Sequence, residues 1–379
     1  MAPKSQSLTL LIVAQWACTS LWFASNAALP SLNAELALEG GVGALTAAVQ
    51  LGFIGGAALV ALSGLADRVA SHRLFFVAAC VGALANVAPI AVPDARVLAA
   101  SRVVVGASLA GIYPVGMKLA ASWKREGLGT AMGYLVGALV LGTALPHLLG
   151  GVLPWRTTFG AVSLLAFAGG LVVAVLLREG PYTRSQPFRF RDLRLLARGP
   201  NYRRALLGYL GHMWELYVFW ALAPALLAET GWSAPQWPFA VIGIGAVGCA
   251  IAGHVAQRFG PRSVARVAMV TSGVACLLAP WLHTLPRVLA LAFLLLWGLA
   301  VVADSPLLST LTAHACPPEL KGTGLALATS LGFGATVVSL FFADTFERPA
   351  VAMAALGLGP LLGALALRNG ALPALAPSG

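Results

Sequence analysis

The chain has 379 residues, of which 59% are hydrophobic and 10% are charged, and its formal net charge is +11. Soluble domains carry about 25% charged residues, so this composition excludes an ordinary soluble protein. It predicts an integral membrane protein whose solvent is the lipid bilayer.

The apolar stretches are long enough for twelve membrane-spanning helices, because one span needs about 20 mainly apolar residues. In chain order, the predicted spans are residues 8–30, 42–65, 74–92, 96–121, 127–152, 157–177, 204–228, 238–257, 264–283, 287–312, 322–343 and 350–368. The longest polar segment lies after the sixth span. We therefore predict an all-α polytopic membrane protein with an N-terminal six-helix half (1–177), a cytoplasmic basic linker (178–203) and a C-terminal six-helix half (204–379).

A short motif occurs twice, and its copies are separated by about half the length of the chain. The first copy reads SGLADRVASHR from Ser63, and the second reads GHVAQRFGPR from Gly253, so that Asp67 and Gln257 occupy corresponding positions. Such a duplication of apolar helices is typical of secondary transporters.

The first copy resembles the loop motif Gly-x-Leu-Ala-Asp-Arg-x-Gly-x-Arg that the major facilitator superfamily has between its second and third spans. Ser63 and Ala70 replace the two glycines of the motif, and Gln257 replaces the aspartate in the second copy. The resemblance implies two pseudo-symmetric six-helix halves, the fold of this superfamily. It also implies a gating role for the charged residues that match the motif, which are Asp67, Arg68, Arg73, Arg258 and Arg262.

A physical reason exists for this motif. An acidic side chain at the end of one helix can accept hydrogen bonds from the N-terminus of a neighbouring helix and pair with arginine. We expect Asp67 to stabilise one conformation in this way. Because Gln257 replaces the acid, we expect the second lock to be weaker.

The fourth and fifth spans carry two further resemblances. Arg102, with Gly106 four residues later, is similar to the Arg/Gly motif of the superfamily's fourth helix. The sequence GTALPHLLGG from Gly142 loosely resembles the Gly/Pro-rich motif of its antiporters, which slightly favours efflux. The alternative for the fifth span is a kinked and closely packed helix.

Strongly polar or aromatic residues share one face on each of the first, fourth, seventh and tenth spans. Arg102 and Tyr113, for example, lie eleven residues and about 20° apart on a helix. In the superfamily these spans line the central cavity, so the resemblance implies a substrate and proton cavity there. The residues assigned to it are Gln15, Trp22, Asn26, Arg102, Tyr113, His212, Glu215, Trp297 and Asp304.

Each of these polar groups has an alternative role, a hydrogen bond at a contact between helices. The substrate stays open between a polar or zwitterionic metabolite and an amphipathic compound. Arg102 suits an anion, whereas Glu215 and Asp304 suit a cation or a proton. The tryptophans that suit an apolar or aromatic portion of a substrate are Trp22, Trp214, Trp220 and Trp297.

Lys and Arg are unevenly distributed between the two sides of the predicted membrane. The odd-numbered loops hold only Arg96, Arg156, Arg287 and Arg348, and the N-terminus and even-numbered loops hold most of the others. Cytoplasmic loops carry such an excess of positive charge, which explains the net charge better than nucleic-acid binding does. Both termini are therefore predicted to be cytoplasmic, and we expect a multi-pass, monomeric protein of a bacterial inner (cell) membrane, in contact with lipids.

The sequence favours a transporter over an enzyme. The five cysteines have unrelated spacings that indicate neither disulfides nor a metal site, and we expect no metal, no cofactor and no catalytic residue. No nucleotide-binding Gly-x-x-x-x-Gly-Lys-Ser/Thr motif occurs. We therefore predict a secondary active transporter that moves a small molecule by alternating access.

A carboxyl group in the middle of an apolar span can carry a proton through the membrane. Glu215 is the most central such group and has His212 one turn before it, and Asp304 is the alternative carrier. Proton coupling, as symport or antiport, is therefore the expected energy source. The remaining alternatives are a facilitator or uptake symporter of a small organic anion, a membrane-embedded lipid enzyme, and a sensor that does not transport.

Overall fold

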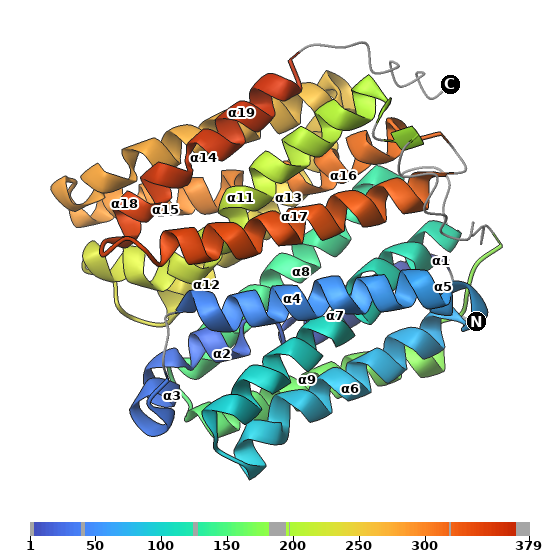
Figure 1. Cartoon of the computed structure of the whole chain (residues 1–379), viewed down its shortest axis with the longest axis horizontal. Helices are drawn as coiled ribbons and strands as arrows, with labels where there is room; N and C mark the ends of the chain where they lie inside the picture. Colours follow the sequence, from blue (N-terminus) through green and yellow to red (C-terminus); the bar gives the residue numbers. More distant parts are fainter. Residues whose placement is uncertain are drawn as a thin grey trace.

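The computed structural model describes residues 4–38, 42–123, 128–181, 195–196, 198–317 and 320–368, and in these ranges all regular secondary structure is helical. The helices lie roughly side by side, and the two ends of the chain are at the same end of the molecule (Figure 1). We call this the terminal end.

The first helix group comprises the elements before the predicted linker. Its helices are α1 (Lys4–Thr19), α2 (Ala24–Ala27), α3 (Leu29–Leu36), α4 (Val42–Ser63), α5 (Leu65–Arg68), α6 (Ser71–Ala91), α7 (Ala95–Trp123), α8 (Leu128–Gly150) and α9 (Trp155–Leu176).

The second helix group begins at Pro200, near the end of the predicted linker. Its helices are α11 (Pro200–Glu229), α12 (Gln236–Gly243), α13 (Gly245–Phe259), α14 (Pro261–Leu278), the 3-10 helix η1 (Ala279–Thr284), α15 (Arg287–Ala300), α16 (Ser305–His314), α17 (Lys321–Ala343), α18 (Pro349–Leu356) and α19 (Leu358–Ala366).

The twelve predicted spans are confirmed, since each coincides with one helix or with two or three consecutive helices. Ten of them are long and apolar enough to cross a membrane among the residues that the structure covers. The other two are α1–α2, which is interrupted, and α11, whose 30 residues include His212 and Glu215.

Four spans are interrupted by a turn of the backbone, which the sequence analysis does not anticipate. The interruptions lie at residues 20–23, at Ile244, at residues 301–304 and at Gly357. Backbone hydrogen bonds continue through them: Trp22 N–H donates to the carbonyl of Thr19, and Ser305 N–H to that of Val302. This pairing matters because lipid offers no partner to a backbone group.

Glycines bring the helices of each group into direct contact. A Cβ atom at Gly106 of α7 would lie 1.9 Å from the carbonyl oxygen of Val49 in α4, and one at Gly298 of α15 would lie 1.9 Å from that of Val241 in α12. The second pair lies 192 positions after the first, at 298 against 106 and at 241 against 49. The same helix contact is therefore built twice, as the duplicated motif predicts.

The two groups meet mainly at two places. At one, α8 packs against α12 and α13, and at the other, α4 packs against α17. In Figure 1, α4 and α17 run beside each other between the lower and upper groups.

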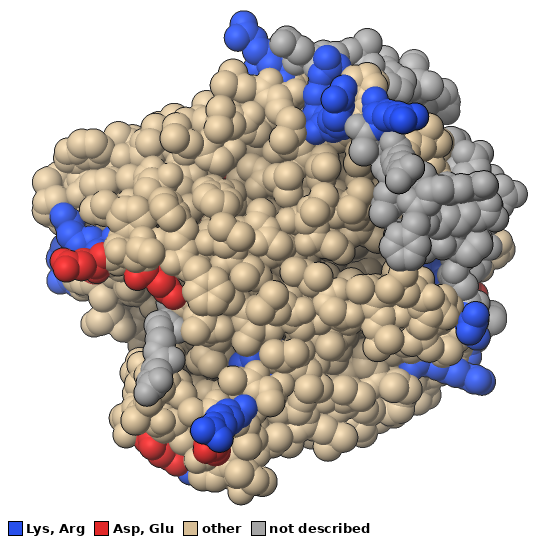
Figure 2. Space-filling view, in the orientation of Figure 1, with Lys and Arg blue, Asp and Glu red and all other residues tan. Residues whose placement is uncertain are grey.

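On the face that Figure 2 shows, a broad area across the middle carries few charged side chains, and Lys and Arg gather at the terminal end. Large apolar side chains are exposed on the surface, such as Leu84 and Leu164, each 69% exposed. This surface fits a lipid solvent.

At the terminal end, the chain leaving α9 is tied to the ends of two other helices. Glu179 Oε1 accepts hydrogen bonds from the backbone N–H and the hydroxyl of Ser71, at 2.8 and 2.6 Å, at the start of α6. At the end of α7, Trp123 Nε1 donates to the carbonyl of Arg178 at 2.8 Å, and Ser122 Oγ accepts from the backbone N–H of Gly180 at 2.8 Å.

The tie also shifts the acidity of the carboxyl group. Partial burial acts to raise the pKa of Glu179, but the hydrogen bonds from Ser71 and the nearby Lys118 and His72 outweigh it, so this pKa lies below its usual value. The negative charge of Glu179 at the N-terminus of α6 therefore stabilises the fold above pH ~4.3, the ordinary pKa of glutamate. This contribution is lost as the pH falls through the lowered pKa.

The substitution Glu179→Gln tests this tie. At pH 7 it should lower the free energy of unfolding by about 1 kcal/mol, the usual value of a helix cap, and the deficit should shrink once acid protonates the wild-type carboxyl group. Unfolding of the purified protein at neutral and acidic pH measures both effects. Glu347→Gln, at an exposed site, is the control. An equal deficit at both pH values would contradict the account.

Candidate functional site

Arg102 is fully buried inside the first helix group. Its Nη2 donates to Asn86 Oδ1 of α6 at 2.7 Å, and its guanidinium carbon lies 5.1 Å from the ring centroid of Phe159 in α9. Asn86 Nδ2 in turn donates to the carbonyl of Phe159 and to Ser163 Oγ. Arg102 therefore links α7 to α6 and α9 of its own group.

Two other predicted residues, His212 and Asp304, contact each other inside the second group. His212 Nδ1 of α11 lies 2.8 Å from Asp304 Oδ1, and the side chains are 0% and 2% exposed. Asp304 lies in the interruption between α15 and α16 and is the residue at the N-cap of α16. Its carboxyl group is thus next to a helix N-terminus, a position that favours a negative charge.

Glu215 is one turn beyond His212 but contacts α14 instead. Its Oε2 accepts a hydrogen bond from Cys276 Sγ at 2.9 Å, and its Oε1 has no partner. No ion pair joins Glu215 to a Lys, Arg or His among the residues described. His212 was expected to be its neighbour but contacts Asp304.

Trp297 belongs to the same cluster as Glu215. Its Nε1 donates to Ser272 Oγ at 3.1 Å, and its ring centroid lies 4.7 Å from that of Phe219. A chain of contacts thus runs from α15 through α14 to Glu215 on α11. The structure brings the predicted residues of the seventh and tenth spans together.

The remaining predicted cavity residues lie at other contacts of the first group. Asn26 Nδ2 of α2 donates to Thr46 Oγ1 of α4 at 2.7 Å. The amide of Gln15 on α1 is buried next to Gly116 of α7 and has no hydrogen-bond partner. Tyr113 is partly buried on α7. The structure does not bring these residues to Arg102.

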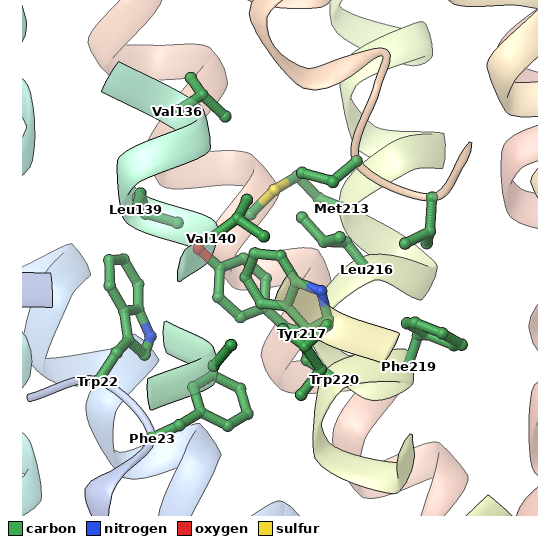
Figure 3. Close-up of a cluster of buried hydrophobic side chains, with 14 of the residues drawn as sticks. Trp22, Phe23, Val136, Leu139, Val140, Met213, Leu216, Tyr217, Phe219 and Trp220 are labelled. Carbon is green, nitrogen blue, oxygen red and sulfur yellow. The ribbon is translucent and has the colours of Figure 1, made fainter. Parts of the chain in front are cut away.

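Six buried aromatic rings meet where the two helix groups face each other. We call them the central aromatic cluster, and they are Trp22, Phe23, Phe53, Tyr217, Trp220 and Phe333. The first three come from the first group, and the other three come from α11 and α17 of the second. Figure 3 shows Trp22 and Phe23 opposite Tyr217 and Trp220.

Ring contacts cross between the groups throughout this cluster. The centroid of Trp22 lies 5.5 Å from Tyr217 and 5.8 Å from Phe333, and Phe53 lies 4.3 Å from Phe333. Trp220 contacts Phe23 at 6.1 Å in an edge-on arrangement. These separations are typical of attractive aromatic pairs.

Sequence reasoning singled out Trp22 and Trp220 but missed the other four rings. A phenylalanine on an apolar span is normally a lipid-facing or core residue. Phe23, Phe53 and Phe333 carry no polar group that would indicate a functional role. Only the position of Tyr217, two residues after Glu215 on the seventh span, offered a signal.

The gating residues differ in what the structure shows of them. Arg68, Arg73 and Arg258 are exposed, and Arg262 is partly buried. The side chain of Asp67 lies outside the described residues, so the proposed lock on the first motif copy stays a prediction. In the second copy, Gln257 Nε2 donates to Thr130 Oγ1 of α8 at 2.9 Å and so joins the two groups near the terminal end.

The glycines of the fifth-span motif are packing positions. A Cβ atom at Gly142 of α8 would overlap the side chain of Thr19 on α1, and one at Gly151 would overlap Pro235 of the second group. Pro146 lies inside an uninterrupted helix. These contacts support the closely packed helix that was the alternative interpretation of this motif.

Nothing in the described part of the chain forms a metal site. No group of three or more His, Cys, Asp or Glu side chains is placed to hold a metal ion there, and the five cysteines are free. The chemistry available to the interior is ion pairing, hydrogen bonding, proton exchange and aromatic stacking.

Comparison with known proteins supports the architecture. Residues 11–340 match the family model of the Major Facilitator Superfamily. The crystal structure of the human organic anion transporter MFSD10 (TETRAN) is similar over 97% of this chain and 100% of that one, with 18% identity and a TM-score of 0.75. A bacterial homolog of the human lysosomal transporter Spinster, inward-facing and unoccupied, is similar over 96% and 97%, with 16% identity and a TM-score of 0.69. These two likenesses establish the fold alone.

The contact between Arg102 and Asn86 yields a stability test. Asn86→Ala should lower the free energy of unfolding by about 2 kcal/mol, because it removes a buried hydrogen bond to a charged group. Asn33→Ala, at an exposed position of α3, is the control and should be close to neutral. Thermal or denaturant unfolding of the purified proteins measures both. If Asn86→Ala unfolds like the control, the pair does not hold α6 and α7 together.

Proposed function

The chain belongs to the major facilitator superfamily, and we propose that it is a secondary active transporter that moves a small molecule through the membrane by alternating access. It is a multi-pass integral membrane protein with a transporter fold. The two helix groups meet mainly through α4 with α17 and through α8 with α12 and α13. Rocking of one group against the other about these contacts would open a central site to each side in turn.

We further propose that transport is coupled to protons. The observation that supports this most is the set of titratable groups buried in the second group, His212, Glu215 and Asp304. Ionisable residues inside a membrane domain are costly and usually functional. A carboxyl group that binds a proton from one side and releases it to the other couples the two fluxes.

Glu215 is our first choice of proton carrier. Its Oε1 has no hydrogen-bond partner, whereas Asp304 lies beside His212. Protonation of Glu215 would leave its hydrogen bond with Cys276 in place and would break no contact with a basic group. Asp304 remains the alternative carrier, because its protonation would release His212.

The orientation and boundaries are part of this proposal. The Lys and Arg at the terminal end support a cytoplasmic location for both termini in a bacterial inner membrane. The halves would be residues 1–177 and 204–379. Most of the linker between them, 178–203, lies outside the described residues.

Efflux is our preferred direction, on the resemblance of the fifth span to antiporters. A facilitator, or an uptake symporter of a small organic anion, is the competing transport mechanism. The matched family and both solved neighbours are transporters. This shared role counts against the alternative of a lipid enzyme. A sensor that does not transport would give no substrate flux, which distinguishes it from each of these transport mechanisms.

Flux in proteoliposomes tests the mechanism. Wild-type protein should accumulate a radiolabelled substrate, found by screening organic anions and uncharged aromatic solutes, when a pH gradient is imposed. Proton antiport predicts accumulation in vesicles with an acidic lumen, and symport predicts it with an alkaline lumen. Glu215→Gln should lose at least tenfold of the gradient-driven accumulation yet retain exchange of labelled for unlabelled substrate.

Two controls complete the experiment. Glu347→Gln, on an exposed loop, should behave like wild type, and Asp304→Asn tests the alternative carrier. Gradient-driven accumulation by Glu215→Gln at the wild-type level would exclude Glu215 as the carrier. A wild-type protein that ignores the gradient would refute proton coupling and favour a facilitator.

A further inference from the structure

We propose that the central aromatic cluster recognises an uncharged, flat and largely apolar molecule that carries hydrogen-bond acceptors such as carbonyl or ether oxygens. This inference rests on the proposed transport function, because it names the substrate class of the transporter. Three independent features of the interior support it.

The first feature is the composition of the interface between the groups. Rings of Trp22 and Phe53 on one side contact rings of Tyr217 and Phe333 on the other. When the two groups separate, these contacts are lost. A flat ring about 3.5 Å thick could enter the gap and stack against both sides, which would compensate for the lost ring contacts.

The second feature is a set of buried donors without partners. The indole Nε1 atoms of Trp22 and Trp220 have no hydrogen-bond partner, although each side chain is 1% exposed. Buried polar groups are normally paired, and an indole N–H can only donate. Acceptor atoms on a bound molecule would satisfy both donors.

Neighbouring polar groups have the same character. His147 on α8 is buried with its Nε2 unpartnered, and its ring centroid lies 6.2 Å from that of Phe23. Gln50, one turn before Phe53 on α4, is buried with both amide atoms unpartnered. These groups are neutral or can be neutral, and they add hydrogen-bonding capacity around the rings.

The third feature is the placement of the buried ionisable groups. Arg102 is held by Asn86 in the first group, Asp304 by His212 in the second, and Glu215 by Cys276 of α14. None of these contacts involves a ring of the cluster. A charged ligand bound among the rings would therefore lack a counter-ion, and burial of an unpaired charge is strongly unfavourable.

Binding of matched probes tests the inference. The protein is reconstituted in lipid nanodiscs, and binding is corrected for partition into empty nanodiscs. The probes are an uncharged methoxycoumarin, its analogues with a carboxylate or a quaternary ammonium group, and methylnaphthalene, which has a flat ring and no oxygen. We expect the methoxycoumarin to bind at least tenfold more tightly than either charged analogue.

Variants of the indole donors then test the role of the N–H groups. Trp22→Phe with Trp220→Phe keeps a ring at both positions and removes both N–H groups. It should weaken methoxycoumarin binding about tenfold, as the loss of two hydrogen bonds predicts, and should leave methylnaphthalene binding unchanged. Trp281→Phe, at a 60% exposed tryptophan of η1, is the matched control and should have no effect.

Each contrary result overturns the inference. Binding of a charged analogue as tight as that of methoxycoumarin, no effect of the double variant, or no binding of any probe would each refute the proposed substrate class. The proposed function fails separately. If the methoxycoumarin binds as expected but no solute shows protein-dependent flux in proteoliposomes, the recognition stands and the transport proposal falls.

Discussion

The absence of water from the bilayer is the constraint on which this structure depends, because a polar group inside the protein can be satisfied only by the protein or by a bound molecule. Arg102 contacts Asn86 and Asp304 contacts His212, each within its own helix group. The central part of the surface between the two groups carries the aromatic cluster. Stacking contacts have little directional demand compared with buried ion pairs, so the groups can separate at the centre without exposing an unpaired charge. We infer that this arrangement, with polar contacts inside each group and stacked rings at the centre between them, makes the proposed rocking motion possible.

Close helix contacts make each group internally firm. The glycine contact of Gly106 with Val49 recurs at Gly298 with Val241, and Gly56 with Ala107 recurs at Gly248 with Leu299. Both recurrences lie 192 positions along the chain. The duplication seen in the sequence is therefore a duplication of packing geometry, and two similar units are suited to alternating access.

Much of the fold follows from the sequence, because long apolar segments and the charges between them define spans without tertiary knowledge. The interruptions do not follow. The turn at residues 20–23 contains neither glycine nor proline, so tertiary contacts decide it. The contacts between buried polar side chains do not follow from the sequence either. His212 was expected to act on Glu215, one turn away, but it lies beside Asp304, more than 90 positions later. Phe53 and Phe333 meet only in space, and nothing in their local sequence distinguishes them from lipid-facing residues.

Distances between spin labels would test most directly whether the two groups move as units about the aromatic interface. In a cysteine-free background, one pair joins Gly129 of α8 to Arg258 of α13 near the terminal end, and another joins Asn33 of α3 to Glu347 after α17 at the opposite end. These four positions are exposed, and a pair within the first group, Asn33 with Val92, is the control. The account predicts that substrate or a change of pH shifts the two cross-group distances in opposite directions and leaves the control fixed. Cross-group distances that stay constant, or that change in the same direction, would contradict it.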